Sequence, residues 1–236
     1  MACPRLGLLC LNWLLTSVRA AWSPVVDQGR PPGRSVHVAA WDAIGRQIWI
    51  HGGSQSEFLD DLWTYNVDNK TWERKWPPAP APSKRGDHVA VWDPCEPALW
   101  IHGGFDGRSF FKDLWKYSGN SWTEVTVDGP QERSDHVAVW DTANGALWVH
   151  GGDNGVTLMQ DIWKYDSLHK GTWVLVQDVT PPSAMARHAG VWDDRNLALW
   201  IHGGDDGSSF CYSEAKRDGF TLRFGAFLRH VVTWCS

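Results

Sequence analysis

One pattern of histidine, tryptophan and glycine recurs four times in this chain of 236 residues. Each copy has a His, a Trp four positions later, a second Trp eight positions after that, and a His-Gly-Gly triplet two positions further on. The copies cover residues 37–53, 88–104, 136–152 and 188–204. They follow one another at steps of about 50 residues, and no copy has an insertion inside the pattern. This self-similarity indicates a repeat protein in which every copy forms the same structural unit.

Each repeat contains four short runs typical of β-strands. In the second repeat these runs cover residues 88–92, 98–101, 113–117 and 122–125. β-branched and aromatic residues fill them, and Gly, Asp, Asn and Pro separate them. No stretch shows the period of an amphipathic helix. The sequence therefore predicts an all-β protein.

The constant gap of seven residues between the two Trp of each copy predicts a β-hairpin. If the hairpin is symmetric about Glu96, Trp92 faces Trp100 and Ala90 faces His102 across the ladder. This register stacks a Trp pair on one face of every repeat. A slip of one residue would move each side chain to the other face, so the prediction depends on the register.

Four features of the first three repeats make the chain resemble the kelch repeat: an Arg before the first strand, the Gly-Gly after the second, a Tyr ending the third and a Trp opening the fourth. They are Arg34, Gly52-Gly53, Tyr65 and Trp72 in the first repeat, Arg85, Gly103-Gly104, Tyr117 and Trp122 in the second, and Arg133, Gly151-Gly152, Tyr165 and Trp173 in the third. The resemblance implies a β-propeller of four-stranded antiparallel blades with the first strand innermost. Within the kelch superfamily, we expect the secreted galactose-oxidase-like and attractin-like group.

The repeats predict three complete blades and a partial fourth within residues 21–210. The repeats start near residues 34, 85, 133 and 187, and residues 21–26 resemble the last strand of a blade, which predicts an orphan strand at the N-terminal end. A propeller typically has 4 to 8 blades. We therefore interpret the propeller as incomplete.

The repeat pattern breaks after Phe210. We interpret residues 211–236 as an irregular tail in which residues 229–234 resemble the start of a fifth repeat that is cut off. The alternative, a diverged closing strand at residues 220–224, stays open. Cys211 and Cys235 lie in this tail; with Cys95 they are too few for a disulfide framework, and their pairing also stays open.

Residues 1–20 have the features of a secretory signal peptide. Arg5 precedes an apolar run, and Val18-Arg19-Ala20 provides a cleavage site. We expect a secreted or extracellular protein, glycosylated at the sequon that begins at Asn69. If the segment is instead a mis-started gene model, the protein is cytoplasmic and Asn69 is simply part of a turn. No apolar run has the length of a membrane span.

Charge and motif content exclude several functions. The net charge is −5 with acids and bases interspersed, so we expect no binding to nucleic acid. The recurring His residues are more typical of hydrogen-bonded core residues than of metal ligands or general bases, and no nucleophile recurs beside them. A copper site like that of galactose oxidase needs a Tyr-Cys crosslink, and Cys95 has no Tyr nearby. We predict no catalytic residue, no metal and no cofactor.

The surface that differs between repeats lies in the loops joining the second strand to the third. In kelch propellers these loops and the ends of the loops before each repeat share one face, so the resemblance implies a protein-binding face there. The predicted partner-binding residues are Ser54, Gln55, Phe105, Asp106, Arg108, Asp153, Asn154, Asp205 and Asp206, with Arg85, Arg133 and Arg187 beside them. Alternatively, the loops are solvated turns and the arginines hold the blades.

These observations predict a non-catalytic protein-interaction module in the secretory or extracellular space. The 18 Trp residues suggest an alternative, a carbohydrate-binding propeller, because flat aromatic rings stack on sugars. A third hypothesis is an intracellular kelch adaptor, such as a substrate receptor of a ubiquitin ligase.

Overall fold

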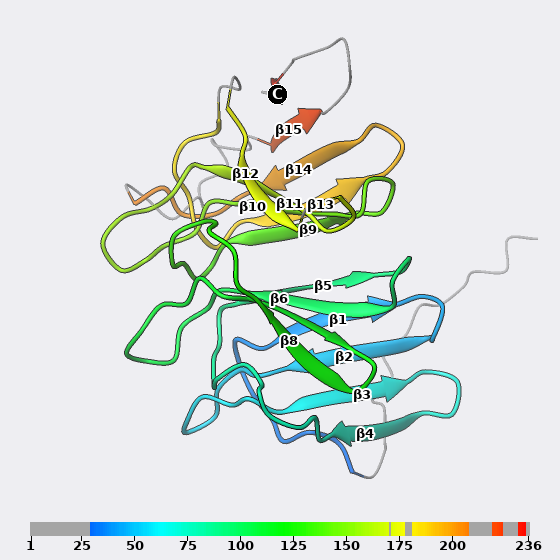
Figure 1. Ribbon diagram of the computed structural model, residues 1–236. Coiled ribbons are helices and arrows are strands. Elements are labelled where there is room, and N and C mark those ends of the chain that lie inside the picture. The colour runs from blue at the N-terminus through cyan, green and yellow to red at the C-terminus, as the bar shows by residue number, and fades with distance from the viewer. Residues whose placement is uncertain (1–28, 170, 178–180, 208–218, 224–230, 235–236) are drawn as a thin grey trace, which may run out of the picture.

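A computed structural model describes residues 29–169, 171–177, 181–207, 219–223 and 231–234, and this part of the chain is all β (Figure 1). Its strands form four separate four-stranded sheets, each antiparallel and each in chain order. This arrangement confirms the predicted fold class of kelch-type blades. The described residues include no helix that could cross a membrane.

We call the strands of each blade a, b, c and d in chain order. Blade 1 contains β1 (Val38–Asp42), β2 (Gln47–His51), β3 (Leu62–Asn66) and β4 (Thr71–Lys75). Blade 2 contains β5 (Val89–Asp93), β6 (Ala98–His102), β7 (Leu114–Ser118) and β8 (Ser121–Val125). Blade 3 contains β9 (Val137–Asp141), β10 (Ala146–His150), β11 (Ile162–Asp166) and β12 (Thr172–Leu175). Blade 4 contains β13 (Ala189–Asp193), β14 (Ala198–His202), β15 (Gly219–Arg223) and β16 (Val231–Trp234).

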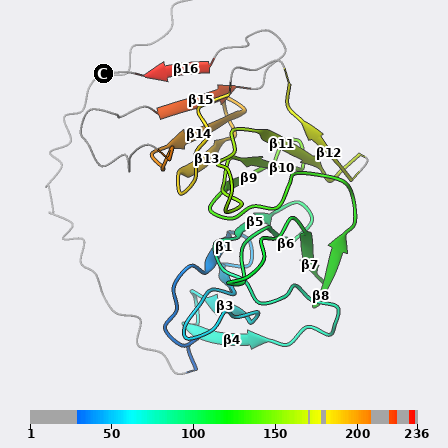
Figure 2. The same ribbon diagram turned by 90° about the vertical axis from the view of Figure 1, so that its left-hand side faces the viewer.

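The a strands lie innermost. Each contacts the a strand of the next blade, β1 with β5, β5 with β9 and β9 with β13. The d strands β4, β8 and β12 lie toward the outside of the molecule (Figure 2). The four blades are therefore arranged around an axis lined by strand a, as the kelch resemblance implies.

The hairpin between strands a and b differs from its predicted register by one residue. Trp92 lies opposite Leu99, and Trp100 lies opposite Val91. The cause is the turn: the Asp93 carboxylate accepts hydrogen bonds from the backbone N–H of Cys95 and Glu96, at 2.9 and 3.2 Å. This Asx turn fixes a loop of four residues rather than one centred on Glu96. The predicted Trp pair within each repeat is therefore wrong.

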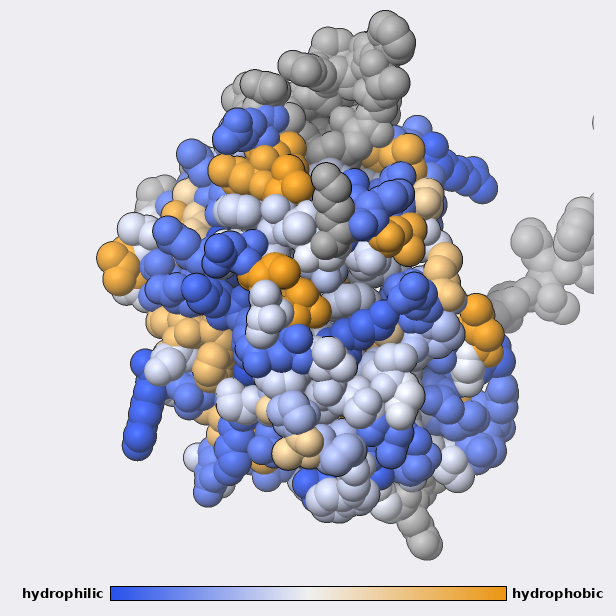
Figure 3. All heavy atoms as spheres, in the orientation of Figure 1, coloured by the Kyte–Doolittle hydropathy of each residue, from blue (hydrophilic) through white to orange (hydrophobic). Residues whose placement is uncertain are grey.

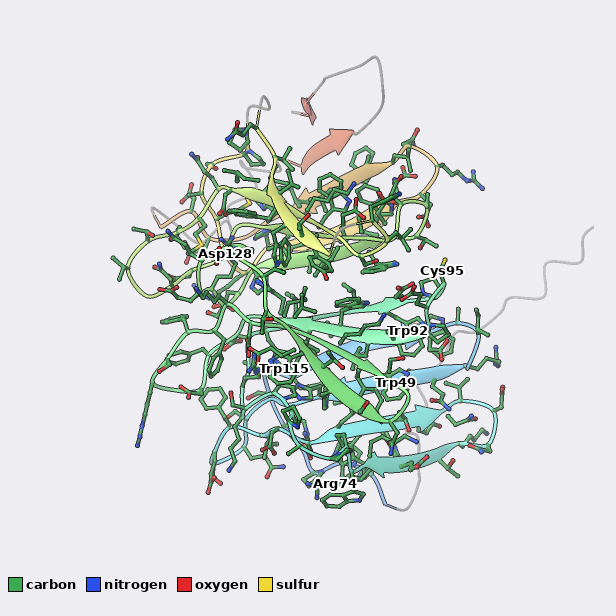
Figure 4. All side chains as sticks on the ribbon, viewed as in Figure 1. Trp49, Arg74, Trp92, Cys95, Trp115 and Asp128 are labelled. Atoms are coloured by element: carbon green, nitrogen blue, oxygen red, sulfur yellow. The ribbon has the colours of Figure 1, made fainter. Side chains whose placement is uncertain are left out.

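The Trp pairs form between blades instead. Trp49 of blade 1 stacks on Trp92 of blade 2 with ring centroids 5.5 Å apart and planes 17° apart. The Trp100–Trp140 and Trp148–Trp192 pairs repeat this stack at the next two boundaries, both at 5.8 Å. In Figure 4 Trp49 and Trp92 are labelled at the first boundary. Each hydrophobic cluster of buried residues likewise draws on two consecutive blades, so the core sits between sheets.

In blade 4, only the two inner strands, β13 and β14, belong to the recurring sequence pattern. Strand β15 pairs with β14, and β16 pairs with β15 as the outermost strand. This placement matches the closing-strand alternative for residues 220–224 and differs from the interpretation of residues 229–234 as a fifth repeat. Pairing along β14 satisfies the backbone groups that an open edge would leave unpaired. The predicted signal peptide, the orphan strand at residues 21–26, Cys211 and Cys235 lie outside the described residues.

Candidate partner-binding face

Buried arginines fix the ends of the b-to-c connections. The Arg133 guanidinium donates to both carboxylate oxygens of Asp161, at 2.7 and 2.9 Å, and to the carbonyl oxygen of Gly151 at 2.8 Å. Arg85 makes the same contacts with Asp113 and Gly103. Burial alone would raise the pKa of the Asp161 carboxyl, but the hydrogen bonds from Arg133 and Trp163 hold it below its usual value.

These contacts show that two of the predicted partner-binding residues have a structural role instead. The side chains of Arg85 and Arg133 are fully buried, so neither can reach a partner. The alternative that the arginines hold the blades is right for both. Because the Asp partner opens strand c in the same repeat, each arginine joins the start of its repeat to the middle.

Arg187 belongs to a different position from Arg85 and Arg133. Its spacing to the following His aligns it with Asp87 and Asp135, and the signature Arg position of the fourth repeat is occupied by buried Met185. Arg187 is exposed, and its guanidinium lies 3.5 Å from the Asp135 carboxylate and 3.1 Å from that of Asp205. Sequence reasoning missed Asp87 and Asp135, although their fixed spacing to the recurring His marks them.

The residue before each recurring His lies at one end of the axis between the a strands, in a position that we call the channel mouth. Val36, Asp87, Asp135 and Arg187 all have positive φ angles, between 49° and 58°. The backbone N–H of Asp87 donates to the carbonyl of Val36, that of Asp135 to Asp87, and that of Arg187 to Asp135, at 2.8 to 3.0 Å. This chain of hydrogen bonds links the four blades. It also holds one side chain from each blade at the same level.

These side chains line a cavity of about 250 Å³ together with the adjoining His residues. Burial and the neighbouring Asp135 carboxylate raise the pKa of Asp87 to about 6. Burial also raises the pKa of Asp135, which Arg187 partly offsets. The channel mouth therefore carries two carboxyl groups and one arginine, and the Asp87 carboxyl loses its proton at a higher pH than an ordinary Asp, since its pKa is about 6.

The b-to-c loops surround this mouth. Isolated bridges pair Ser35 with Ser54, Gly86 with Phe105, Ser134 with Asp153 and Ala186 with Asp205, each joining a loop to the segment that leads into strand a. The a-to-b turns lie at the opposite ends of the strands: in Figure 4, Cys95 of the blade 2 a-to-b turn lies at one end, and Asp128, in the connection from strand d of blade 2 to strand a of blade 3, lies at the other. The structure thus brings the loops of all four blades to one face, which we call the loop face.

Several predicted residues of the loop face shape the loops rather than extend from them. Phe105, one of the predicted partner-binding residues, is half-buried and packs against Phe110 and Phe58, with ring centroids 4.6 and 6.1 Å apart. The Asp106 carboxylate accepts hydrogen bonds from the backbone N–H of Arg108 and Ser109. The carboxylates of Asp153 and Asp205, and the side-chain carbonyl of Asn154, cap turns in the same way.

The exposed side chains of the loop face are fewer than predicted. Gln55 and Arg108 are exposed, whereas Ser54 and Asp206 are half-buried. Val156, which sequence reasoning missed, is 87% exposed at the tip of the third loop. Figure 3 shows isolated hydrophobic side chains among polar ones along the loop side of the blades, at the left. Such a mixed surface is compatible with a protein partner, because non-obligate interfaces are about as apolar as the rest of a protein surface.

The recurring His residues form buried pairs across the blade boundaries. Nδ1 of His51 lies 3.0 Å from Nε2 of His88, and the His102–His136 and His150–His188 pairs repeat this contact at 3.0 and 2.9 Å. The prediction of hydrogen-bonded core histidines is confirmed at these three boundaries. Within the described residues, no cluster of His, Cys, Asp and Glu could hold a metal ion.

Comparisons with known proteins agree with this geometry. The model of the KLHDC2/KLHL20/DRC7 kelch-repeats domain matches residues 11–204. The chain is 31% identical over 109 residues to the mouse Rab9 effector protein with kelch motifs, a match that covers 44% of this chain and 28% of the relative. It is 33% identical over 113 residues to the tip elongation aberrant protein 1 of Schizosaccharomyces pombe, covering 44% of this chain and 9% of the relative. The matched region is thus less than a third of each relative.

Proposed function

Since the chain belongs to the KLHDC2/KLHL20/DRC7 family of kelch-repeat domains, we propose that it is a non-catalytic protein-interaction module whose loop face binds a protein partner. One relative is an effector of Rab9 by name, which supports a binding role rather than a catalytic one. The secreted galactose-oxidase-like grouping stays a prediction.

The observation that carries this proposal is the contrast between the buried residues that hold the blades and the exposed residues of the loop face. The buried residues that hold the blades recur from repeat to repeat, whereas Gln55, Arg108 and Val156 occur once each at exposed loop positions. A cationic side chain, an amide and an apolar tip beside the acidic channel mouth give a polar surface with one apolar contact point. Recognition of a protein partner commonly uses such a combination.

The test is to exchange exposed loop-face residues without touching the turns. A variant with Arg108→Glu and Val156→Asp should bind a partner captured by affinity purification at least about tenfold more weakly, which is about 1.4 kcal/mol. The matched control exchanges Lys70→Glu and Ile44→Asp, two exposed residues in turns at the opposite ends of the strands. Unchanged affinity of the first variant, or an equal loss in the control, would place the site elsewhere.

The Trp residues that suggested a glycan-binding function do not support it. The Trp residues of the repeat pattern that lie at blade boundaries stack on one another there, so their faces are not free for sugars. Competition by simple sugars in the binding assay would revive this alternative.

We further propose a location in the secretory or extracellular space, because residues 1–20 have the pattern of a signal peptide. An intracellular kelch adaptor is the alternative, and the Rab9 effector relative supports it equally. Expression in a secretory host should give a protein that starts near Ala21 and carries a glycan at Asn69, which is exposed in a turn. Asn69→Gln should remove that glycan. An uncleaved cytosolic protein would contradict the proposal.

A further inference from the structure

We propose that two copies of this chain associate head to tail, with blade 4 of each copy docking against blade 1 of the other. The boundary between consecutive blades, which we call a joint, has the same construction three times within the chain. The strands and loops at the two ends of the array carry the two unfilled halves of a fourth joint. The second copy supplies the missing half at each end.

Each internal joint combines a Trp stack, a His pair and two backbone hydrogen bonds. At the first joint, Trp49 stacks on Trp92 and His51 pairs with His88. The N–H of Gly53 donates to the carbonyl of Arg85 at 2.9 Å, and the N–H of Asp87 donates back to Val36 at 3.0 Å. The second and third joints repeat all four contacts with the equivalent residues.

Blade 4 carries the unfilled first half of a joint. Val191 on strand a is 61% exposed, whereas its equivalents Val91 and Val139 are 7% and 6% exposed. His202 is exposed, although the equivalent His of every other blade is buried. In blades 1 to 3, a Cβ atom added to the first glycine of the His-Gly-Gly triplet would contact atoms of the following blade. At the equivalent Gly203 of blade 4, no described residue lies within 4 Å of the added Cβ atom.

Blade 1 carries the second half of a joint, and this half is open at strand a, although Tyr65 on strand c is buried. Trp41 is 47% exposed, whereas Trp140 at the same position of blade 3 is 8% exposed. His37 is exposed, whereas the His at the same position of the other blades is buried. Among the described residues, no hydrogen bond joins His37 to His202 and no ring stack joins Trp41 to Trp200. The array therefore does not fill its own halves.

The two halves are complementary in their hydrogen-bonding groups. By analogy with the internal joints, blade 4 offers the N–H of Gly204 and the carbonyl of Arg187, and blade 1 offers the carbonyl of Arg34 and the N–H of Val36. Within the described part of the chain, these four groups have no backbone partner. When a second copy docks, each of the two N–H groups thus donates to one of the two carbonyl groups, as in the internal joints.

The complementarity of the two described ends favours a second copy. Two identical head-to-tail joints, related by a two-fold axis, pair each end of one copy with the opposite end of the other. Open ends would otherwise expose apolar side chains and invite uncontrolled association.

The test measures the mass of the full chain in solution by sedimentation equilibrium. The wild-type chain should have twice the mass of one copy at micromolar concentration. Trp41→Asp removes one half of the joint and Trp200→Asp the other, so each variant alone should be monomeric. An equimolar mixture should form dimers of lower affinity, because one intact joint remains. Leu168→Asp, at an exposed apolar residue in the turn between strands c and d of blade 3, should stay dimeric.

Two checks keep the result decisive. Each variant must keep a cooperative melt, and His202→Asp replaces Trp200→Asp if the latter fails to fold, since His202 is exposed. A wild-type chain that is monomeric at micromolar concentration would overturn the proposal. So would dimers that persist in the Trp41 variant, or a mixture of the two variants that stays monomeric.

Discussion

Replacing Arg133 with Met should show how much of a blade's stability depends on its buried arginine. The Arg133 side chain is fully buried and donates to Gly151, to both oxygens of Asp161, and through Nε to the carbonyl of Gln131 at 3.0 Å. Met fits this position sterically, since the equivalent Met185 of the fourth repeat is buried and 6% exposed. The substitution therefore tests the hydrogen bonds rather than the packing.

The expected loss is about 3 kcal/mol in the free energy of unfolding, the lower end of the range for a broken buried ion pair. The substitution leaves Asp161 charged without its partner, but the Asp161 side chain is 29% exposed, so water compensates part of the loss. The carbonyl of Gly151 also loses a donor, which adds to the cost. Arg133→Lys should lose less, because Lys keeps the charge but cannot donate to both carboxylate oxygens and to the carbonyl in one planar fork.

The assay is urea unfolding at pH 7 followed by Trp fluorescence, for Arg133→Met, Asp161→Asn and the double variant. Asn keeps the size of Asp161 and an acceptor for the indole N–H of Trp163, which donates at 2.7 Å. The double variant should cost less than the sum of the single variants by about 2 kcal/mol or more. Additivity within about 0.5 kcal/mol would refute the argument, since the two side chains would then stabilise the blade independently.

Two further outcomes follow from the joints. Trp140→Ala should cost about 3–5 kcal/mol, whereas Trp41→Ala, at the same repeat position but 47% exposed, should cost about 1–2 kcal/mol when unfolding is measured at a dilution where the chain is monomeric. Burial lowers the pKa of the joint histidines, to about 3 for His51, so the unfolded chain binds more protons than the folded one below pH 6.5. The melting temperature should therefore fall as the pH decreases from 6.5 toward 4, and a flat profile over this range would contradict neutral buried His pairs.

The sequence predicted the elements better than their contacts. The strands, the glycines after strand b and the core role of His88 follow from residue types and spacing, because these properties are local. The pairing of Trp92 does not, since a periodic pattern shows which residues are equivalent but leaves open whether they meet within one repeat or between two. The Asx turn at Asp93 decided this register, and it was overlooked.

The partner-binding residues were predictable only in part. The position of each loop follows from the repeat, but the direction of its side chains depends on local hydrogen bonds. Asp106 caps its own turn and Phe105 packs on a neighbouring loop, and neither fact is visible in composition. The assignment of Arg187 to the signature position is a different kind of error, because counting back from His188 would have shown Met185 there.

Because every joint combines strand b of one blade with strand a of the next, the length of the array can change without any new interface. Duplicating or deleting one whole repeat in the gene leaves each remaining joint with the same Trp stack and the same His pair. A partial duplication, by contrast, would separate strand b from the strand a that it must meet. Selection can therefore vary the number of blades but must keep the cut points between repeats.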